Sequence, residues 1–214
     1  MTTLIIDYGM GNLASVRRAV EECGHSVWIS EDPQSIREAS HLILPGVGAF
    51  GDGSQALHQR GWVPAIHQAV AQEGIPLLGI CLGMQLLATE GTEGGCYPGL
   101  NLIPGQVVRF VPTDAQERIP HVGWNSVIQA QSVQRSVLFE GIADETDFYF
   151  VHSYHFLPQQ PAIHAVGYTA YAGKFVSVIQ QGRVFGTQFH PEKSAQGGLR
   201  LLKNFLEHGA TSSC

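Results

Sequence analysis

Short apolar runs alternate with helix-like segments over the first eighty residues. Four runs have the length of buried strands, at residues 3–7, 26–29, 41–44 and 75–80. After the first run, Asn12 can cap a helix whose apolar positions recur at helical spacing. Residues 54–73 also have a helical pattern, with a break near residues 61–64. This alternation predicts a mostly parallel sheet with helices on both faces.

The pattern changes after residue 94, where Gly and Pro separate shorter apolar runs. Strand-like runs at 106–111, 148–151 and 165–168 predict antiparallel or mixed strands added to the same sheet. A last strand is expected at 183–189 and an amphipathic helix at 198–208. Because no linker, repeat or low-complexity tract interrupts the chain, we expect one α/β domain spanning residues 1–214.

Composition and charge exclude several classes of protein. Hydrophobic residues make up 44% of the chain and charged residues 14%, which is too apolar for a disordered protein. No apolar stretch reaches the roughly 18 residues of a membrane span. A net charge of −6 argues against nucleic acid as the main ligand. The N-terminus has no basic leader, so no signal peptide and a cytoplasmic location are expected.

One of the four cysteines has surroundings suited to chemistry. Cys23, Cys96 and Cys214 form no CxxC pair with it, and we expect all four to be reduced thiols. Cys81 ends a predicted strand and precedes a helix-like stretch, between Gly79 and Gly83. The two glycines suggest a sharp turn that lifts the thiol out at a helix N-terminus. There the dipole favours the thiolate over the thiol, whose usual pKa is about 8.5.

A base and an orienting carboxylate are available a hundred residues later. His190 follows the strand predicted at 183–189, and Glu192 lies two positions on. In an extended segment these side chains share a face, so Glu192 can accept the second ring proton of His190. Pro191 stiffens the segment between them. Cys81, His190 and Glu192 therefore predict acyl transfer by an activated thiol.

Backbone amides offer an oxyanion hole for that reaction. The N–H of Leu82 follows the nucleophile directly, and the turn at residues 45–48 can add the N–H of Val47 or Gly48. The turn, Cys81 and His190 each follow a strand, so one rim of the sheet should carry them all. Loss of one such donor typically costs about 3 kcal/mol in the barrier.

Simpler interpretations compete with each signal. A cysteine after a strand is often structural, and a His-x-Glu pair usually lies on the surface. Residues 46–51 match G-x-G-x-x-G, but they are not in the first strand–helix turn and no acid follows at the right distance, so no cofactor is expected. His152 and His155 lack a third ligand at sensible spacing, so no metal is expected either.

The motifs together resemble those of the class I (triad) glutamine amidotransferases over the full length. The segments that carry the resemblance are 45–50 (PGVGAF), 79–87 (GICLGMQLL) and 186–194 (GTQFHPEKS). Segments 7–13, 120–125 and 149–154 are similar to the branch that delivers ammonia to a separate (βα)8 cyclase subunit in histidine biosynthesis. The resemblance implies a flavodoxin-like fold.

The resemblance also implies a mechanism. Cys81 attacks the side-chain amide of glutamine, His190 protonates the leaving ammonia and activates water, and Glu192 orients His190. It implies substrate contacts at Gly48, Gln85, Ser153 and Tyr154. In the family the turn at 45–48 reorients before its N–H reaches the oxyanion, so we expect weak glutaminase activity in the isolated chain.

The implied partner is the cyclase subunit, in a heterodimer. Family interface positions fall on Trp124, Asn125, Tyr149 and Lys193, although Trp124 and Tyr149 could equally be core residues. Three alternatives stay open. The chain could feed ammonia to another synthase, act alone as a cysteine hydrolase or isomerase, or be a non-catalytic regulatory module. The intact Cys81, His190 and Glu192 argue against the last.

Overall fold

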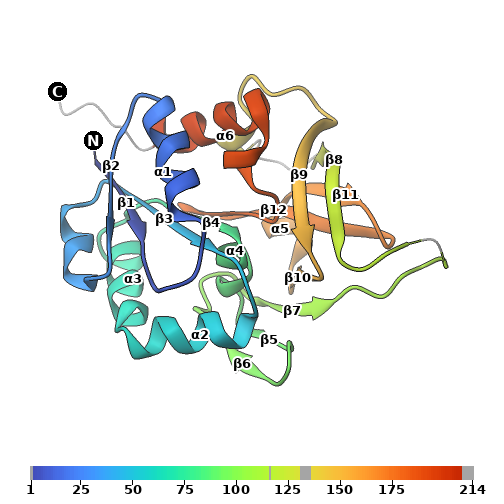
Figure 1. Cartoon of the computed structure of the whole chain (residues 1–214), viewed down its shortest axis with the longest axis horizontal. Helices are drawn as coiled ribbons and strands as arrows, with labels where there is room; N and C mark the ends of the chain where they lie inside the picture. The colour runs from blue at the N-terminus through green and yellow to red at the C-terminus, as the bar shows by residue number, and fades with distance from the viewer. Residues whose placement is uncertain (1, 116, 131–135, 209–214) are drawn as a thin grey trace.

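The central feature is a nine-stranded mixed sheet with the order β2-β1-β3-β4-β13-β12-β11-β8-β9 (Figure 1). The computed structural model describes residues 2–115, 117–130 and 136–208. Five neighbouring strands are parallel: β1 Thr2–Ile6, β2 Ser26–Ser30, β3 His41–Gly46, β4 Leu77–Cys81 and β13 Val184–Thr187. The remaining four pair antiparallel: β8 His121–Gln129, β9 Thr146–His152, β11 Ala165–Ala170 and β12 Lys174–Gln181. The predicted open α/β sheet with antiparallel additions is confirmed.

Helices cover both faces of the parallel strands because the strands are apolar on both faces. In β1, Ile5 packs into the core cluster that contains α1 (Leu13–Glu22) and α6 (Ala195–Glu207). Leu4 and Ile6 point the other way, into the cluster that contains α2 (Phe50–Gln59) and α3 (Trp62–Ala71). Figure 1 shows α1 and α6 above the sheet and α2 and α3 below it.

Local signals in the sequence explain two helix boundaries. The Asn12 side chain accepts a hydrogen bond from the Ser15 amide, which caps α1 as predicted. Gly61, with φ +76°, separates α2 from α3 and confirms the expected break. However, α2 begins at Phe50, four residues before the predicted start, where the Phe50 amide donates to the Glu93 carboxylate.

A second, four-stranded sheet corrects the prediction that all later strands join the first. Its order is β10-β7-β5-β6, with β10 Tyr154–Pro158, β7 Gly105–Arg109, β5 Glu90–Gly91 and β6 Tyr97–Pro98. β9 and β10 are separated only by Ser153, so the chain passes from one sheet to the other at that residue.

The remaining elements are short. They are α4 Leu82–Leu86, α5 Pro161–His164 and the 3-10 turns η1 Pro33–Glu38, η2 Val137–Phe139 and η3 Pro191–Lys193. Within the described ranges, no helix combines the length and the apolar character needed to cross a bilayer.

Candidate active site

Cys81 occupies a strained elbow between β4 and α4. Its φ of +55° and ψ of −109° are unusual for a residue with a side chain, and it is 6% exposed. The flanking glycines have a different role from the one predicted. A Cβ at Gly83 would overlap the Leu44 carbonyl, and one at Gly79 would lie 2.6 Å from the Gly83 oxygen. Cys81 itself therefore makes the sharp turn, while the glycines let β3, β4 and α4 pack closely.

His190 and Glu192 form a buried pair beside this elbow. His190 Nδ1 lies 2.8 Å from Glu192 Oε1, and their side chains are 3% and 2% exposed. The two residues are joined by a turn, because η3 begins at Pro191, and the predicted extended segment is wrong. The predicted pairing of the two side chains is present, since the 3-10 turn swings Glu192 back towards the ring.

The electrostatics of His190 favour the imidazolium. Burial lowers the pKa of His190, but the nearby Cys81 sulfur and the Glu192 carboxylate outweigh this effect and raise the pKa to about 10. No well-aligned hydrogen bond joins the second ring nitrogen, Nε2, to the thiol, and Nε2 is buried without a partner. This nitrogen is therefore available to Cys81 or to a bound molecule. The arrangement therefore places an imidazolium beside the Cys81 thiol.

A cavity of about 270 Å³ lies in front of the thiol. Most of the predicted site residues line this cavity, while Glu192 lies behind His190. The residues that line the cavity are Val47, Gly48, Cys81, Leu82, Gln85, Glu93, Val151, His152, Ser153, Tyr154 and His190. Gly48 has φ +116°, and a Cβ there would lie 2.7 Å from the Met10 side chain, so the turn needs glycine at this position.

Gln188 is a site residue that sequence reasoning did not single out. Its side chain is fully buried, and its Nε2 donates to the Cys81 Sγ at 3.7 Å. Its Oε1 accepts from Gln85 Nε2 at 3.0 Å, and that same amide donates to the Tyr154 carbonyl at 3.0 Å. Gln188 lies two residues before His190 in the 186–194 motif, and this nearness in sequence is the signal that could have singled it out.

The four predicted interface residues lie outside the cavity. Trp124 on β8 is 54% exposed and makes an edge contact with Tyr149, its partner across the β8–β9 pair. Lys193 is also exposed. The Asn125 side chain differs, because its amide bonds to His121 and to the Ala170 carbonyl within the protein. These internal contacts use both amide hydrogens of Asn125, and its role at an interface stays a prediction.

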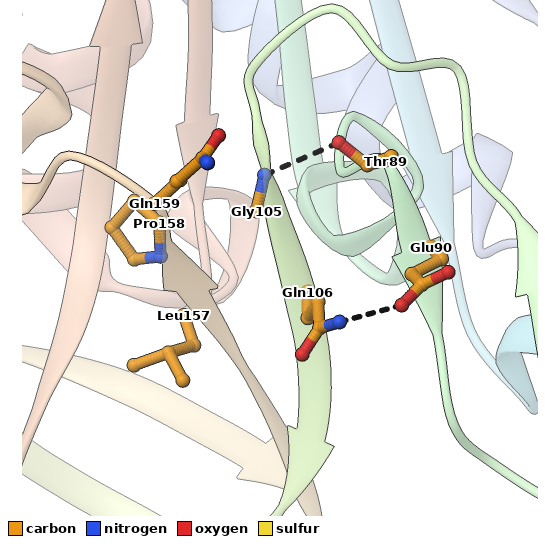
Figure 2. Close-up of a pocket in the computed structure, with 7 residues that line it drawn as sticks. All are labelled: Thr89, Glu90, Gly105, Gln106, Leu157, Pro158 and Gln159. Atoms are coloured by element: carbon orange, nitrogen blue, oxygen red, sulfur yellow. Dashed lines mark hydrogen bonds between the residues drawn. The ribbon is translucent and has the colours of Figure 1, made fainter.

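A larger cavity, of about 400 Å³, lies on the four-stranded sheet (Figure 2). Four of its lining residues are hydrogen-bonded in pairs: the Gly105 amide donates to Thr89, and Gln106 donates to the Glu90 carboxylate. Leu157 and Pro158 of β10 line the other side. It has no nucleophile paired with a base, so size alone does not make it the reactive site.

The His152 and His155 pair has no metal-site geometry. Both ring nitrogens of His152 are used in hydrogen bonds, to the Tyr154 carbonyl and to His121. In the part of the chain that the structure describes, no group of three or more His, Cys, Asp or Glu residues could hold a metal ion.

The fold and this site are those expected of a cysteine-dependent acyl-transfer enzyme of the α/β class. The family model described as glutamine amidotransferase class-I matches residues 4–208, and the chain belongs to that family. The resemblance found from the sequence motifs is thereby confirmed.

Two relatives are similar to this chain over nearly its whole length. Imidazole glycerol phosphate synthase subunit HisH of Moorella thermoacetica is 50% identical over 203 residues, 95% of this chain and 93% of that protein. The subunit of the same name from Chlorobaculum tepidum is 44% identical and covers 95% of this chain and 98% of its own length.

Solved structures share the fold at low sequence identity. PurLQS from Thermotoga maritima matches with a TM-score of 0.76 at 17% identity, covering 96% of this chain and 97% of that chain. A crystal structure of a glutamine amidotransferase matches with a TM-score of 0.72 at 19% identity, covering 95% of this chain and 97% of that chain. These two matches establish the fold alone.

Proposed function

We propose that this chain is the glutaminase subunit of an imidazole glycerol phosphate synthase. The observation that carries the proposal is that Cys81 and His190 line one cavity and that Glu192 is paired with His190 behind it. The high identity to HisH subunits over nearly the whole chain gives the substrate and the pathway. The subunit name itself implies a synthase partner. We also propose that residues 1–214 form one domain, and that the cytoplasm, which keeps thiols reduced, is where it works.

The proposed reaction has two stages. The Cys81 thiolate attacks the side-chain amide carbon of glutamine, the C–N bond breaks, and His190 gives a proton to the departing ammonia. A glutamyl thioester remains. His190 then takes a proton from water, which attacks the thioester and releases glutamate, so the thiolate is regenerated. Glu192 holds Nδ1 of His190, which leaves Nε2 to carry the proton in both stages.

Backbone and side-chain groups of the cavity are proposed to hold the substrate. The N–H groups of Leu82 and of Val47 or Gly48 would stabilise the developing oxyanion. Both donors of Gln85 Nε2 are used internally, so its Oε1 is the atom left to accept a hydrogen bond from glutamine. Gly48 and the main chain at Ser153 and Tyr154 would contact the rest of the substrate.

The partner is proposed to be a separate (βα)8 cyclase that uses the ammonia to make imidazole glycerol phosphate and AICAR, docked in a heterodimer. Trp124, which is exposed, and Tyr149, which is half-buried, form an aromatic pair on the outer side of β8 and β9. The Tyr149 carbonyl accepts from the His190 amide at 2.9 Å, so this surface adjoins the catalytic segment. Lys193 makes no ion pair with any residue that the structure describes, and its charge is free for a partner carboxylate.

The test is a glutaminase assay with and without the cyclase subunit. Glutamate release should be slow for the chain alone and should rise when the cyclase and its nucleotide ligand are added. Co-elution of the two chains in size-exclusion chromatography checks the complex independently. Glutamine turnover that ignores both the cyclase and its ligand would count against the synthase assignment, whereas no turnover at all would count against the glutaminase.

A further inference from the structure

Two buried histidines form one hydrogen-bonded chain that ends at the cavity. His121 on β8 faces His152 on β9, and their Nδ1 and Nε2 atoms are 3.1 Å apart. His152 Nδ1 lies 2.8 Å from the carbonyl oxygen of Tyr154. At the other end, Asn125 Nδ2 lies 3.2 Å from His121 Nε2 and 3.2 Å from the Ala170 carbonyl.

The acceptor at each end fixes the direction of every proton. A carbonyl oxygen can only accept, so His152 must carry its proton on Nδ1 and accept at Nε2. His121 must then donate from Nδ1, and its own Nε2 accepts from the Asn125 amide. The three side chains therefore have one consistent arrangement, with both imidazoles neutral.

The surroundings keep both rings neutral. His121 is 3% and His152 6% exposed, and His121 lies between the rings of Phe150 and Tyr171. Burial lowers the pKa of His121 to about 4, and burial is also the main cause that lowers the pKa of His152 to about 3. A neutral His152 avoids a second positive charge beside the imidazolium of His190.

The carbonyl that this chain reaches is at the corner between the two sheets. Ser153 alone separates β9 from β10, and the hydrogen bond from His152 to Tyr154 closes a turn over it. The same carbonyl accepts from Gln85 Nε2, which in turn reaches Gln188 and the thiol. One hydrogen-bonded network therefore joins Asn125 to Cys81.

We propose that His152 and His121 are positioning residues for glutamine: their hydrogen-bond chain fixes the Tyr154 carbonyl, and with it the cavity wall at Ser153 and the side chain of Gln85. This inference rests on the proposed glutaminase function. The histidines touch no reacting bond, so their removal should weaken glutamine binding more than it slows the chemistry.

Substitution of His152 by asparagine or by glutamine tests the roles of its two ring nitrogens, Nδ1 and Nε2, separately. Asparagine places an N–H donor near Nδ1 and can still hold the Tyr154 carbonyl, whereas glutamine places its amide near Nε2 and cannot. In the complex with the cyclase, we expect His152→Gln to raise the KM for glutamine about tenfold or more and to change kcat less than about threefold. For His152→Asn the rise in KM should be about threefold.

Two further substitutions complete the series. His121→Asn and His121→Gln should show the same order as the His152 variants with smaller rises in KM, because His121 acts through His152. His164→Gln is the matched control, since His164 is a buried histidine on α5 that does not line the cavity. Its KM should equal that of the wild type. Equal KM values for His152→Asn and His152→Gln, or a loss confined to kcat, would overturn the inference.

A second measurement does not depend on activity. Nitrogen-15 NMR of the imidazoles in the full-length wild-type chain should show two neutral rings protonated on Nδ1 at pH 6, assigned by their loss in the His121 and His152 variants. Protonation on Nε2, or a positive charge on either ring, would refute the chain of donors even if the enzyme hydrolyses glutamine. If the wild type releases no glutamate with the cyclase present, the proposed function fails, and the positioning role fails with it.

Discussion

The two walls of the cavity are built in different ways. The wall with Cys81 comes from the centre of the parallel sheet, where strands are buried on both faces and glycines allow close contact with α4. The opposite wall, residues 151–154, is at the edge of the sheet, where β9 is paired on one side only. Its shape depends on hydrogen bonds from His152 and Gln85 to one carbonyl. Backbone packing therefore positions the Cys81 thiol, and side-chain hydrogen bonds position residues 151–154.

The largest loss of activity should come from a substitution in the wall that carries Cys81. Cys81→Ala removes the nucleophile, and we expect glutamine-dependent synthesis to fall by at least about a thousandfold. Synthesis from free ammonium in the complex should continue, because the cyclase is untouched. The two activities are compared in one preparation. Glutamine hydrolysis that survives the substitution would show that another residue is the nucleophile.

A smaller loss of glutaminase activity is expected when Glu192, the partner of His190, is changed. Glu192→Gln keeps an oxygen for the His190 Nδ1 proton but removes the charge that stabilises the imidazolium. We expect kcat for glutamine to fall on the order of 100-fold, less than for Cys81→Ala. The pKa of His190 should fall as well, which shifts the pH profile. A loss as deep as that of Cys81→Ala would mean that Glu192 does more than orient the base.

A substitution at Trp124 tests the proposed cyclase interface on the outer side of β8 and β9. Because the ring is half exposed, Trp124→Ala should leave the melting temperature nearly unchanged and weaken cyclase binding by about 2 kcal/mol, or roughly thirtyfold in Kd. Isothermal titration calorimetry measures the affinity, and Val111→Ala, at a residue that is 76% exposed, is the control. An unchanged Kd would remove Trp124 from the proposed interface.

The smallest effect concerns acid stability of the edge. The pKa of His121 is about 4 in the fold, below the value of about 6.5 for an exposed histidine. Between these pH values the unfolded chain binds a proton that the folded protein does not, so stability falls as the pH falls. Replacement by asparagine removes this effect. Between pH 7 and pH 5 the free energy of unfolding of the wild type should fall by about 1–2 kcal/mol more than that of His121→Asn. Urea denaturation at the two pH values measures both changes. An equal loss in both proteins would show that His121 titrates normally.

The same contrast explains how far the sequence could predict the molecule. Apolar runs and the Asn12 cap predicted the parallel half, because its strands and helices are local patterns with buried faces. The motifs predicted Cys81 and His190, because each lies at or just beyond the end of a strand, and Glu192, because it lies two positions after His190. The second sheet was missed because β5 and β6 have two residues each, too few for a periodic signal.

The polar network lay beyond sequence reasoning for a different reason. His121 and His152 are 31 residues apart and meet only through the register of β8 and β9. In the sequence His152 lies near His155 instead, and this spacing led us to consider a metal site. Which face Asn125 presents likewise depends on that register, which no local pattern specifies.

The proposed mechanism requires that Cys81 is the residue that glutamine acylates. The direct measurement is labelling of the complex with a glutamine analogue that carries a diazoketone in place of the amide, followed by peptide mass spectrometry. We expect one adduct, on the peptide that contains Cys81, and protection by excess glutamine. An adduct on Cys23, Cys96 or Cys214, or labelling of Cys81 that glutamine does not prevent, would contradict the proposed mechanism.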